Sequence, residues 1–223
     1  MRRTKEDSLH TRETLLDAAE TLFSRQGVSR TSLQQIAEQA GVTRGAVYWH
    51  FADKAALFNA MMDRTTLPLE EAVQAMDTAP QPPLDVLRHM AQTALTRIAH
   101  DPRTRRVFNI ATHKVEYVDE LSAVRDRHLR IHGMCQGHIR ACFERAQALG
   151  HILPTIDCEV AAMTHHAQID GLIQRWMLAP DSFDLVDMGL RSIDLLFNGL
   201  SQQQAQAGAT TPSVASSSPP SCS

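Results

Sequence analysis

The apolar residues of this chain recur at helical spacing over almost its whole length, and this periodicity constrains the fold more than any other feature. Between residues 9 and 26, one face carries apolar residues at intervals of three, four and seven: Leu15, Leu16, Ala18, Ala19, Leu22 and Phe23. Four later stretches show the same periodicity, at about 84–100, 119–149, 158–178 and 184–199. No convincing alternation of apolar and polar residues indicates a strand. We therefore expect an all-α protein.

Cap and turn residues divide the first 60 residues into short helices. Ser32 forms a capping-box pattern with the glutamine three residues later. Gly41 ends that helix after about eight residues, and Thr43 can cap a third helix over about 44–50. Asp53 can cap a fourth helix that runs on towards residue 67. Two short helices joined by a tight, glycine-containing turn are the layout of a helix-turn-helix unit.

The stretch from Thr43 to Phe51 is poorly suited to an ordinary surface helix. Gly45 costs about 1 kcal/mol of helix propensity relative to alanine, and the three large rings at 48–50 cannot all face one core. Binding in the major groove of DNA accounts for both features, because Gly45 lets the backbone approach closely. Thr43 and Arg44 stand at the N-terminal end, which meets base edges in helix-turn-helix docking.

Other groups around this stretch suit contacts to the DNA backbone. Tyr48 and His50 can donate hydrogen bonds to phosphates, and Trp49 can brace the backbone. Lys54 follows the Asp53 cap, where the helix dipole disfavours a cation unless a phosphate binds there too. The predicted DNA-contacting residues are Ser32, Thr43, Arg44, Gly45, Tyr48, Trp49, His50 and Lys54.

The first 60 or so residues resemble the DNA-binding domain of TetR-family transcriptional repressors. The matching elements are Ala18-Ala19-Glu20-Thr21-Leu22-Phe23, Gly27, Thr31-Ser32-Leu33, Ile36-Ala37, Ala40-Gly41-Val42, Gly45-Ala46-Val47-Tyr48-Trp49-His50-Phe51, Lys54 and Leu57. Up to about residue 199 the chain resembles the AcrR and TtgR branch of this family, for example in His113-Lys114-Val115-Glu116-Tyr117, Asp170-Gly171-Leu172-Ile173 and Trp176. That branch represses multidrug efflux pump operons and is released from DNA by hydrophobic drugs.

The resemblance implies about nine helices, a homodimer that binds double-stranded operator DNA, and a drug pocket in the C-terminal domain. It also implies that Asn109, His113 and Asp170 are polar groups of that pocket. Asn109 and His113 are four residues apart and share a helix face, and apolar residues surround them, as a site for lipophilic ligands requires. The predicted ligand-binding set is completed by three further residues, Phe108, Ile169 and Trp176.

The last two predicted helices carry apolar stripes that suit a subunit interface. A pair of helices from each subunit could form a four-helix interface. Two-fold symmetry would also place two recognition helices roughly 34–36 Å apart, as successive major grooves require. The alternative is that these stripes are buried only within their own subunit.

Other classes of function find little support in the sequence. Eleven histidines invite a metal site, and His128, His132 and Cys135 could share one face, but no spacing matches a recognisable zinc site. His165 and His166 are adjacent and cannot chelate from one helix face. We therefore expect no metal and no cofactor. No phosphate-binding loop, nucleophile elbow or paired catalytic carboxylates indicate an enzyme, and a large apolar C-terminal domain argues against an architectural DNA-binding role.

Composition sets the remaining expectations. The net charge of -3 argues against a uniformly basic surface. No apolar run is long enough for a transmembrane helix and no signal peptide is evident, so we expect a cytoplasmic protein. We expect a helix-turn-helix DNA-binding domain at 9–69, a ligand-binding and dimerisation domain at 70–200, and a disordered, uncharged tail at 201–223.

The expected function is that of a ligand-responsive repressor of a multidrug efflux operon, released from its operator by a small hydrophobic inducer. The alternative is a TetR-type regulator of another pathway that responds to a different small apolar ligand or to a metal.

Overall fold

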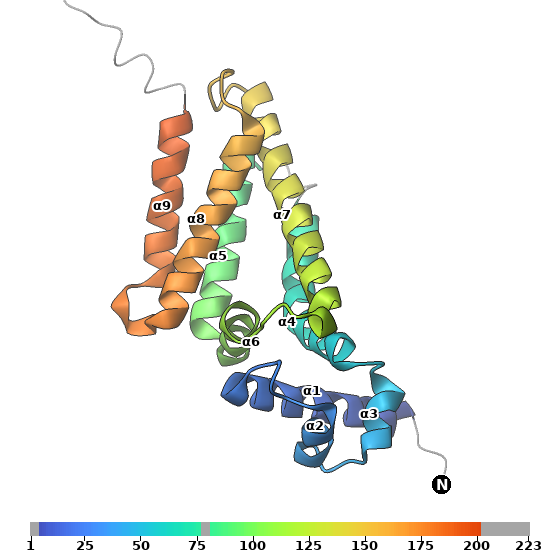
Figure 1. Ribbon diagram of the computed structural model, residues 1–223. Coiled ribbons are helices and arrows are strands. Elements are labelled where there is room, and N and C mark those ends of the chain that lie inside the picture. Colours follow the sequence, from blue (N-terminus) through green and yellow to red (C-terminus); the bar gives the residue numbers. More distant parts are fainter. Residues whose placement is uncertain (1–4, 77–80, 202–223) are drawn as a thin grey trace, which may run out of the picture.

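The computed structural model describes residues 5–76 and 81–201, without the side chains of 67–76 and 181. Within these residues the chain forms nine α-helices and two short 3₁₀ turns, and no strand (Figure 1). The all-α prediction is therefore confirmed. The predicted disordered tail falls, apart from Ser201, outside the described residues. Among the described helices, none combines the length and apolarity needed to cross a membrane.

Three helices form the N-terminal end of the molecule: α1 (Lys5–Gln26), α2 (Leu33–Gln39) and α3 (Arg44–His50). Ser32 and Gln35 form the predicted capping box, and the Thr43 side chain accepts a hydrogen bond from the Ala46 amide. Gly41 has a φ of 67°, a conformation that favours glycine, and turns the chain between α2 and α3. The predicted helix-turn-helix is therefore present.

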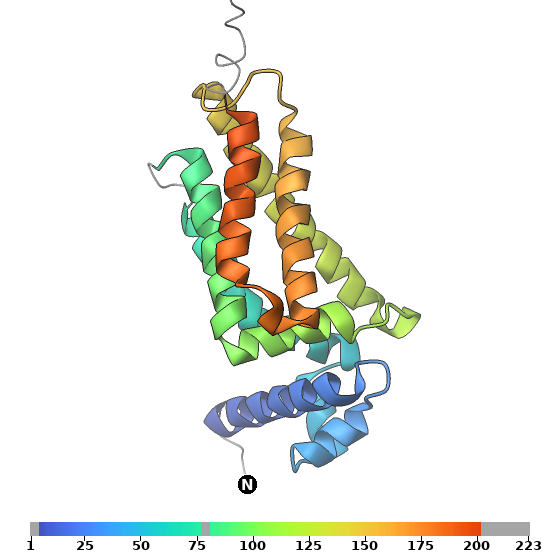
Figure 2. The ribbon, with the colours of Figure 1, turned by 90° about the vertical axis from the view of Figure 1, so that its left-hand side faces the viewer.

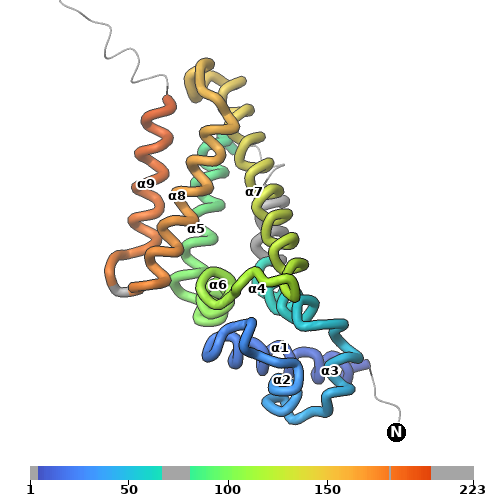
Figure 3. Tube along the Cα trace, viewed as in Figure 1, coloured from blue at the N-terminus to red at the C-terminus, as the bar shows by residue number. Residues whose placement is uncertain are grey.

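The helix α4 (Lys54–Met76) leads away from this end and runs beside α7 (Ser122–Ala148) (Figure 3). The Asp53 carboxylate caps α4 by accepting a hydrogen bond from the Ala56 amide at 2.7 Å. The sequence predicts α4 only as far as about residue 67, but the helix continues to Met76.

The other helices are α5 (Pro83–His100), α6 (Pro102–His113), α8 (Cys158–Leu178) and α9 (Leu185–Leu200). Together with α7, three of them (α5, α8 and α9) form an elongated bundle, while α6 lies across its end and packs on α1 (Figures 1 and 2). The 3₁₀ turns are Asp119–Leu121, which leads into α7, and Pro180–Ser182, between α8 and α9.

Two hydrophobic cores stabilise this arrangement, and they do not divide the chain at one point. The bundle has its own core, formed by residues of α5, α7, α8 and α9. The core beneath α1–α4 also includes Val107 and Ile110 from α6, Leu121, and Val124 from the start of α7. Residues far along the chain therefore complete the N-terminal core. A displacement of α6 or α7 requires the helices packed on that helix to adjust.

Candidate functional site

The helix α3 is anchored on one side and exposed on the other. Val47 and Phe51, four residues apart, are buried in the N-terminal core. Tyr48 and Trp49 point outward, with 48% and 79% of their surface exposed. His50 is half-buried and its ring lies 6.2 Å from that of Phe51. A two-turn helix that presents two large exposed rings has a surface suited to a partner rather than to a core.

The N-terminal end of α3 carries a preorganised cation. The Arg44 guanidinium donates a hydrogen bond to the Tyr48 hydroxyl at 3.1 Å and lies over the same ring, 5.5 Å from its centroid. Gly45 is exposed, and the nearest atom that an added Cβ would meet is Thr43 Oγ1, at 3.9 Å. Internal packing therefore does not require glycine at this position, whereas close approach of another molecule would.

A polar groove of about 630 Å³ brings four of the predicted DNA-contacting residues together. It lies between the start of α2, α3 and the start of α4, and is lined by Ser29, Arg30, Thr31, Ser32, Leu33, Gln34, Arg44, Tyr48, Ala52, Asp53, Lys54 and Glu120. Ser32 is exposed there.

The environment of Lys54 differs from the one that the sequence predicts. The sequence predicts that the Lys54 ammonium binds a phosphate, but in the structure Lys54 is buried. Its Nζ donates to the Ser29 carbonyl at 3.3 Å and pairs with Glu120 Oε2 at 3.1 Å. The Glu120 side chain remains 60% exposed. The sequence pattern could not reveal this partner because Glu120 lies in the turn before α7, far along the chain.

A buried carboxylate ties α1, α4 and α6 together. The Glu20 side chain on α1 is 4% exposed and faces three arginines. Its carboxylate pairs with Arg64 of α4 at 3.0 Å, and with Arg103 and Arg106 of α6 at 3.4 Å each. Because a buried charge requires partners, this cluster holds the three helices in register.

The bundle contains a partly open, mostly apolar cavity of about 250 Å³ between α4, α5, α6, α7 and α8. Its lining consists of Thr66, Leu87, Met90, Ala91, Ala94, Ile98, Phe108, Ile131, His132, Met134, Cys135, His138, Ile139, His165, His166, Ile169, Asp170 and Ile173. An apolar cavity with few polar groups suits a lipophilic ligand.

The cavity includes half of the predicted ligand-binding set. Phe108, Ile169 and Asp170 line it, but Asn109, His113 and Trp176 do not. His113 is exposed in the last turn of α6, and Asn109 is half-buried on a different side of that helix from Phe108. Trp176 is buried in the bundle core with the Arg105 guanidinium 5.7 Å from its ring centroid. In this structure these three residues therefore lie outside the cavity lining, and their role in ligand binding stays a prediction.

One cavity histidine is unusual because no described residue satisfies its polar atoms. His165 is 4% exposed, and neither ring nitrogen has a hydrogen-bond partner within the described part of the chain. Its ring stacks on Phe197 at 5.9 Å and meets the edge of Phe143 at 6.2 Å. Burial, and to a lesser extent the nearby His166, lower the pKa of His165 from 6.5 to about 4. A neutral ring with two free nitrogens is thus available to a ligand in the cavity.

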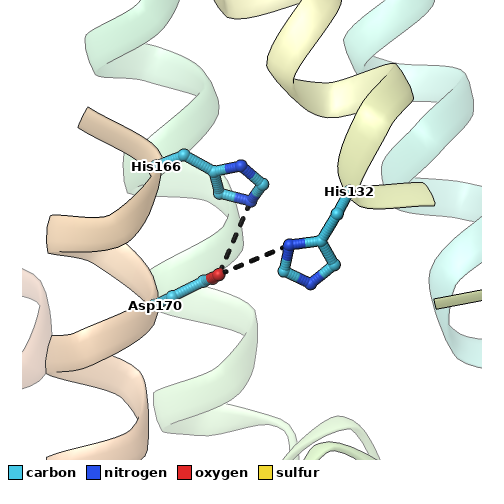
Figure 4. A group of neighbouring side chains, drawn as sticks. All are labelled: His132, His166 and Asp170. Atoms are coloured by element: carbon cyan, nitrogen blue, oxygen red, sulfur yellow. Dashed lines mark ion pairs between the residues drawn. The ribbon is translucent and has the colours of Figure 1, made fainter. Parts of the chain in front are cut away.

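Three further side chains form a polar cluster on the cavity wall (Figure 4). Asp170 Oδ2 lies 3.7 Å from His132 Nδ1 and 3.6 Å from His166 Nε2. The His132 ring also packs against the rings of His128 and His166, with centroids 4.2 and 4.8 Å away. Burial is the largest cause of the lowered pKa of both His128 and His166. The sequence shows the four-residue spacings within each helix, but not that α7 and α8 bring them together.

An apolar surface runs along the outer sides of α8 and α9, which lie side by side in Figure 2. It consists of exposed large residues: Val160, Met163, Leu178, Met188 and Leu195. Leu195 alone has 75% of its surface exposed. Exposed large apolar residues on two neighbouring helices are typical of a protein interface.

Two family models match the chain. The first, described as bacterial regulatory proteins, tetR family, matches residues 15–61. The second, described as MAATS-type transcriptional repressor, C-terminal region, matches residues 82–201. The two models together cover the exposed helix α3 and the entire cavity-bearing bundle.

Individual proteins are similar over most of their length. The HTH-type transcriptional regulator TtgR of Pseudomonas putida is 37% identical over 203 residues, which are 87% of this chain and 97% of TtgR. The solved structure of NalD, the secondary repressor of the MexAB-OprM multidrug efflux pump in Pseudomonas aeruginosa, is 35% identical, with a TM-score of 0.81 over 88% of this chain and 100% of NalD. The SmeT-triclosan complex is 28% identical, with a TM-score of 0.76 over 95% of this chain and 100% of that one. SmeT is the repressor of the Stenotrophomonas maltophilia multidrug efflux pump SmeDEF.

Proposed function

This chain belongs to the TetR family of bacterial transcriptional regulators, and on that premise we propose that it is a dimeric repressor of a multidrug efflux pump operon. Small hydrophobic compounds that enter the cavity release it from operator DNA. The observation that carries this proposal is the position of α6, because Phe108 lines the cavity while Val107 and Ile110 are buried in the N-terminal core, which also holds Val47 of α3. The likeness to NalD and SmeT, both efflux pump repressors, supports the choice of target.

In the proposed complex, α3 lies in the major groove of the operator. Thr43 and Arg44 face base edges, and the absence of a side chain at Gly45 lets the backbone approach. The other predicted contacts bind or brace the phosphate backbone: Ser32, Tyr48, Trp49, His50 and Lys54. Lys54 can do so only if its ammonium is shared with, or released by, Glu120, with which it pairs at 3.1 Å.

The ligand shifts the equilibrium between two conformations of the protein that differ in the position of α6. A compound that packs against Phe108 favours one position of α6, and α6 shares the N-terminal core and the Glu20 cluster with α1 and α4. If α3 no longer fits the major groove when α6 is in that position, ligand binding lowers operator affinity. A coupling of about 1–3 kcal/mol corresponds to a release of roughly 5- to 150-fold. A ligand hydroxyl or carbonyl group would satisfy a ring nitrogen of His165.

The dimer forms through the apolar surface of α8 and α9. Pairing this surface with a second copy gives a four-helix interface and buries side chains that are otherwise exposed. A two-fold axis there also presents two copies of α3 to one face of the DNA.

The test is a mobility shift on DNA from upstream of the protein's own gene, with triclosan as the probe ligand. We expect a salt-sensitive shift that triclosan abolishes. Arg44→Ala should lose the shift but keep triclosan binding in calorimetry, whereas Phe108→Ala should keep the shift and respond less to triclosan. If both variants lose both activities equally, the separation of the two sites is wrong. A shift that no lipophilic compound alters would contradict the efflux-repressor proposal.

A further inference from the structure

The polar cluster on the cavity wall has the composition of a transition-metal site. It offers two imidazole nitrogens and one carboxylate oxygen, from His132, His166 and Asp170, and these three ligand atoms all lie within 4.8 Å of one another. Each of the three residues is half-buried and lines the cavity. Imidazole and carboxylate ligands together suit Zn²⁺, Ni²⁺ or Cu²⁺, whereas Mg²⁺ and Ca²⁺ favour sets made of oxygen alone.

The two distances to the carboxylate are close to those of tetrahedral coordination. Ligand atoms about 2.0–2.1 Å from a zinc ion lie roughly 3.3 Å from one another. Asp170 Oδ2 is 3.6 Å from His166 Nε2 and 3.7 Å from His132 Nδ1. The three ligand atoms all lie within 4.8 Å of one another, so the two histidines must move closer together to bind one ion. Figure 4 shows both nitrogens directed at the carboxylate.

Rigid elements hold the three ligands. His166 and Asp170 stand one helical turn apart on α8, so they project from the same face. His132 reaches them from α7, which packs along α8. The ring of His128 also packs against that of His132, with centroids 4.2 Å apart, which restricts the orientation of His132. Ligands on packed helices are better preorganised than ligands on loops.

The helix α7, which carries His132, also connects the cluster to the N-terminal core. Leu121 and Val124, at the start of α7, are buried in the N-terminal core. Arg127, five residues before His132, pairs with Asp63 of α4 and donates to Thr66 at 3.0 Å. An ion that clamps α7 to α8 would therefore bias the helix that touches both cores.

We propose that the cavity binds one Zn²⁺-class ion through His132 Nδ1, His166 Nε2 and Asp170 Oδ2, and that this ion is an effector of the regulator. Three protein ligands leave a fourth coordination position, open towards the cavity, for water or a ligand atom. The effector role rests on the proposed function, but metal binding itself is measured without DNA.

The binding test uses the full chain without a histidine tag, stripped with a chelator. Zn²⁺ is titrated by calorimetry, and Co²⁺ is followed by its visible absorption as a tetrahedral site fills. We expect one ion per chain. The near-isosteric variants His166→Gln and Asp170→Asn should each weaken Zn²⁺ binding at least about tenfold, the range seen when even outer ligand partners are lost. The matched control is His151→Gln, which changes an exposed histidine after α7 and should bind as the wild type does.

Absence of binding, or binding that both cluster variants retain, would overturn the metal site. Circular dichroism of each variant confirms that it is folded. A mobility shift with and without Zn²⁺ then tests the effector role: a changed shift in the wild type but not in His166→Gln supports it, and an unchanged shift in both overturns it. If the chain binds Zn²⁺ but no DNA, the proposed repressor function fails while the metal site stands.

Discussion

Replacing His165 by phenylalanine should remove a specific acid sensitivity of folding. In the folded chain the ring is buried and its pKa is lowered from 6.5 to about 4, whereas in the unfolded chain it titrates near its ordinary value. Acid therefore protonates the unfolded chain first and favours unfolding. The stability is lost as the pH falls from about 6.5 to about 4, and it is present above that window.

The magnitude follows from the two pKa values. Between pH 7 and pH 5, this single histidine should cost the folded state about 2 kcal/mol per chain, and about 3 kcal/mol once both forms are protonated. His165→Phe removes this contribution and keeps a ring against Phe197 and Phe143. The cavity beside the ring can accept the slightly larger side chain.

The assay is urea unfolding at pH 7 and pH 5, at one protein concentration because the proposed dimer couples stability to concentration. The midpoint of the wild type should fall further than that of His165→Phe, by on the order of 1 M urea for a chain of this size. Other titrating groups, including His166, are common to both proteins and cancel in the comparison. His151→Gln, an exposed control, should behave as the wild type does. If His165→Phe and the wild type lose equal stability between the two pH values, the reasoning is wrong.

Three further predictions address the domain contact, the bundle and the interface. Glu120→Gln removes the carboxylate that competes for Lys54 and should strengthen operator binding about three- to tenfold at low salt, by mobility shift; unchanged affinity would contradict the competition. Gly189→Ala should lower the free energy of unfolding by about 1–3 kcal/mol in a urea titration, because its Cβ would clash with Leu95 of α5; a neutral result would mean that this side chain moves aside freely. Leu195→Arg, on the exposed face of α9, should give a folded monomer in sedimentation velocity, and a persistent dimer would place the interface elsewhere.

Most of the secondary structure could be predicted from the sequence because its signals are local. The caps at Ser32, Thr43 and Asp53 act within three residues of themselves, and each stands where the periodic pattern predicted a helix start. The end of α4 was missed because Pro68 follows residue 67, and a proline favours a helix end at the residue before it; the helix nevertheless continues to Met76 and packs on α7. The contact with α7 involves residues far along the chain, so no local pattern near residue 67 predicts it.

In the candidate site, too, some features could be predicted from local sequence and others could not. The exposed rings of α3 could be predicted, since a short helix with two buried positions must leave the others outside. Which residues line the cavity could not, because Asn109 and Phe108 are neighbours in sequence yet differ in the side of α6 that they occupy. One residue of rotation, about 100°, decides between them.

By itself the sequence determined the helices, their caps and the exposed surface of α3, because these depend on residues a few positions apart. Only the tertiary structure decided that Lys54 pairs with Glu120, that His165 is buried with no partner among the described residues, and that His132 meets His166 and Asp170. Each of these environments joins elements whose relative placement is set by the packing of two whole cores, and no local spacing encodes it.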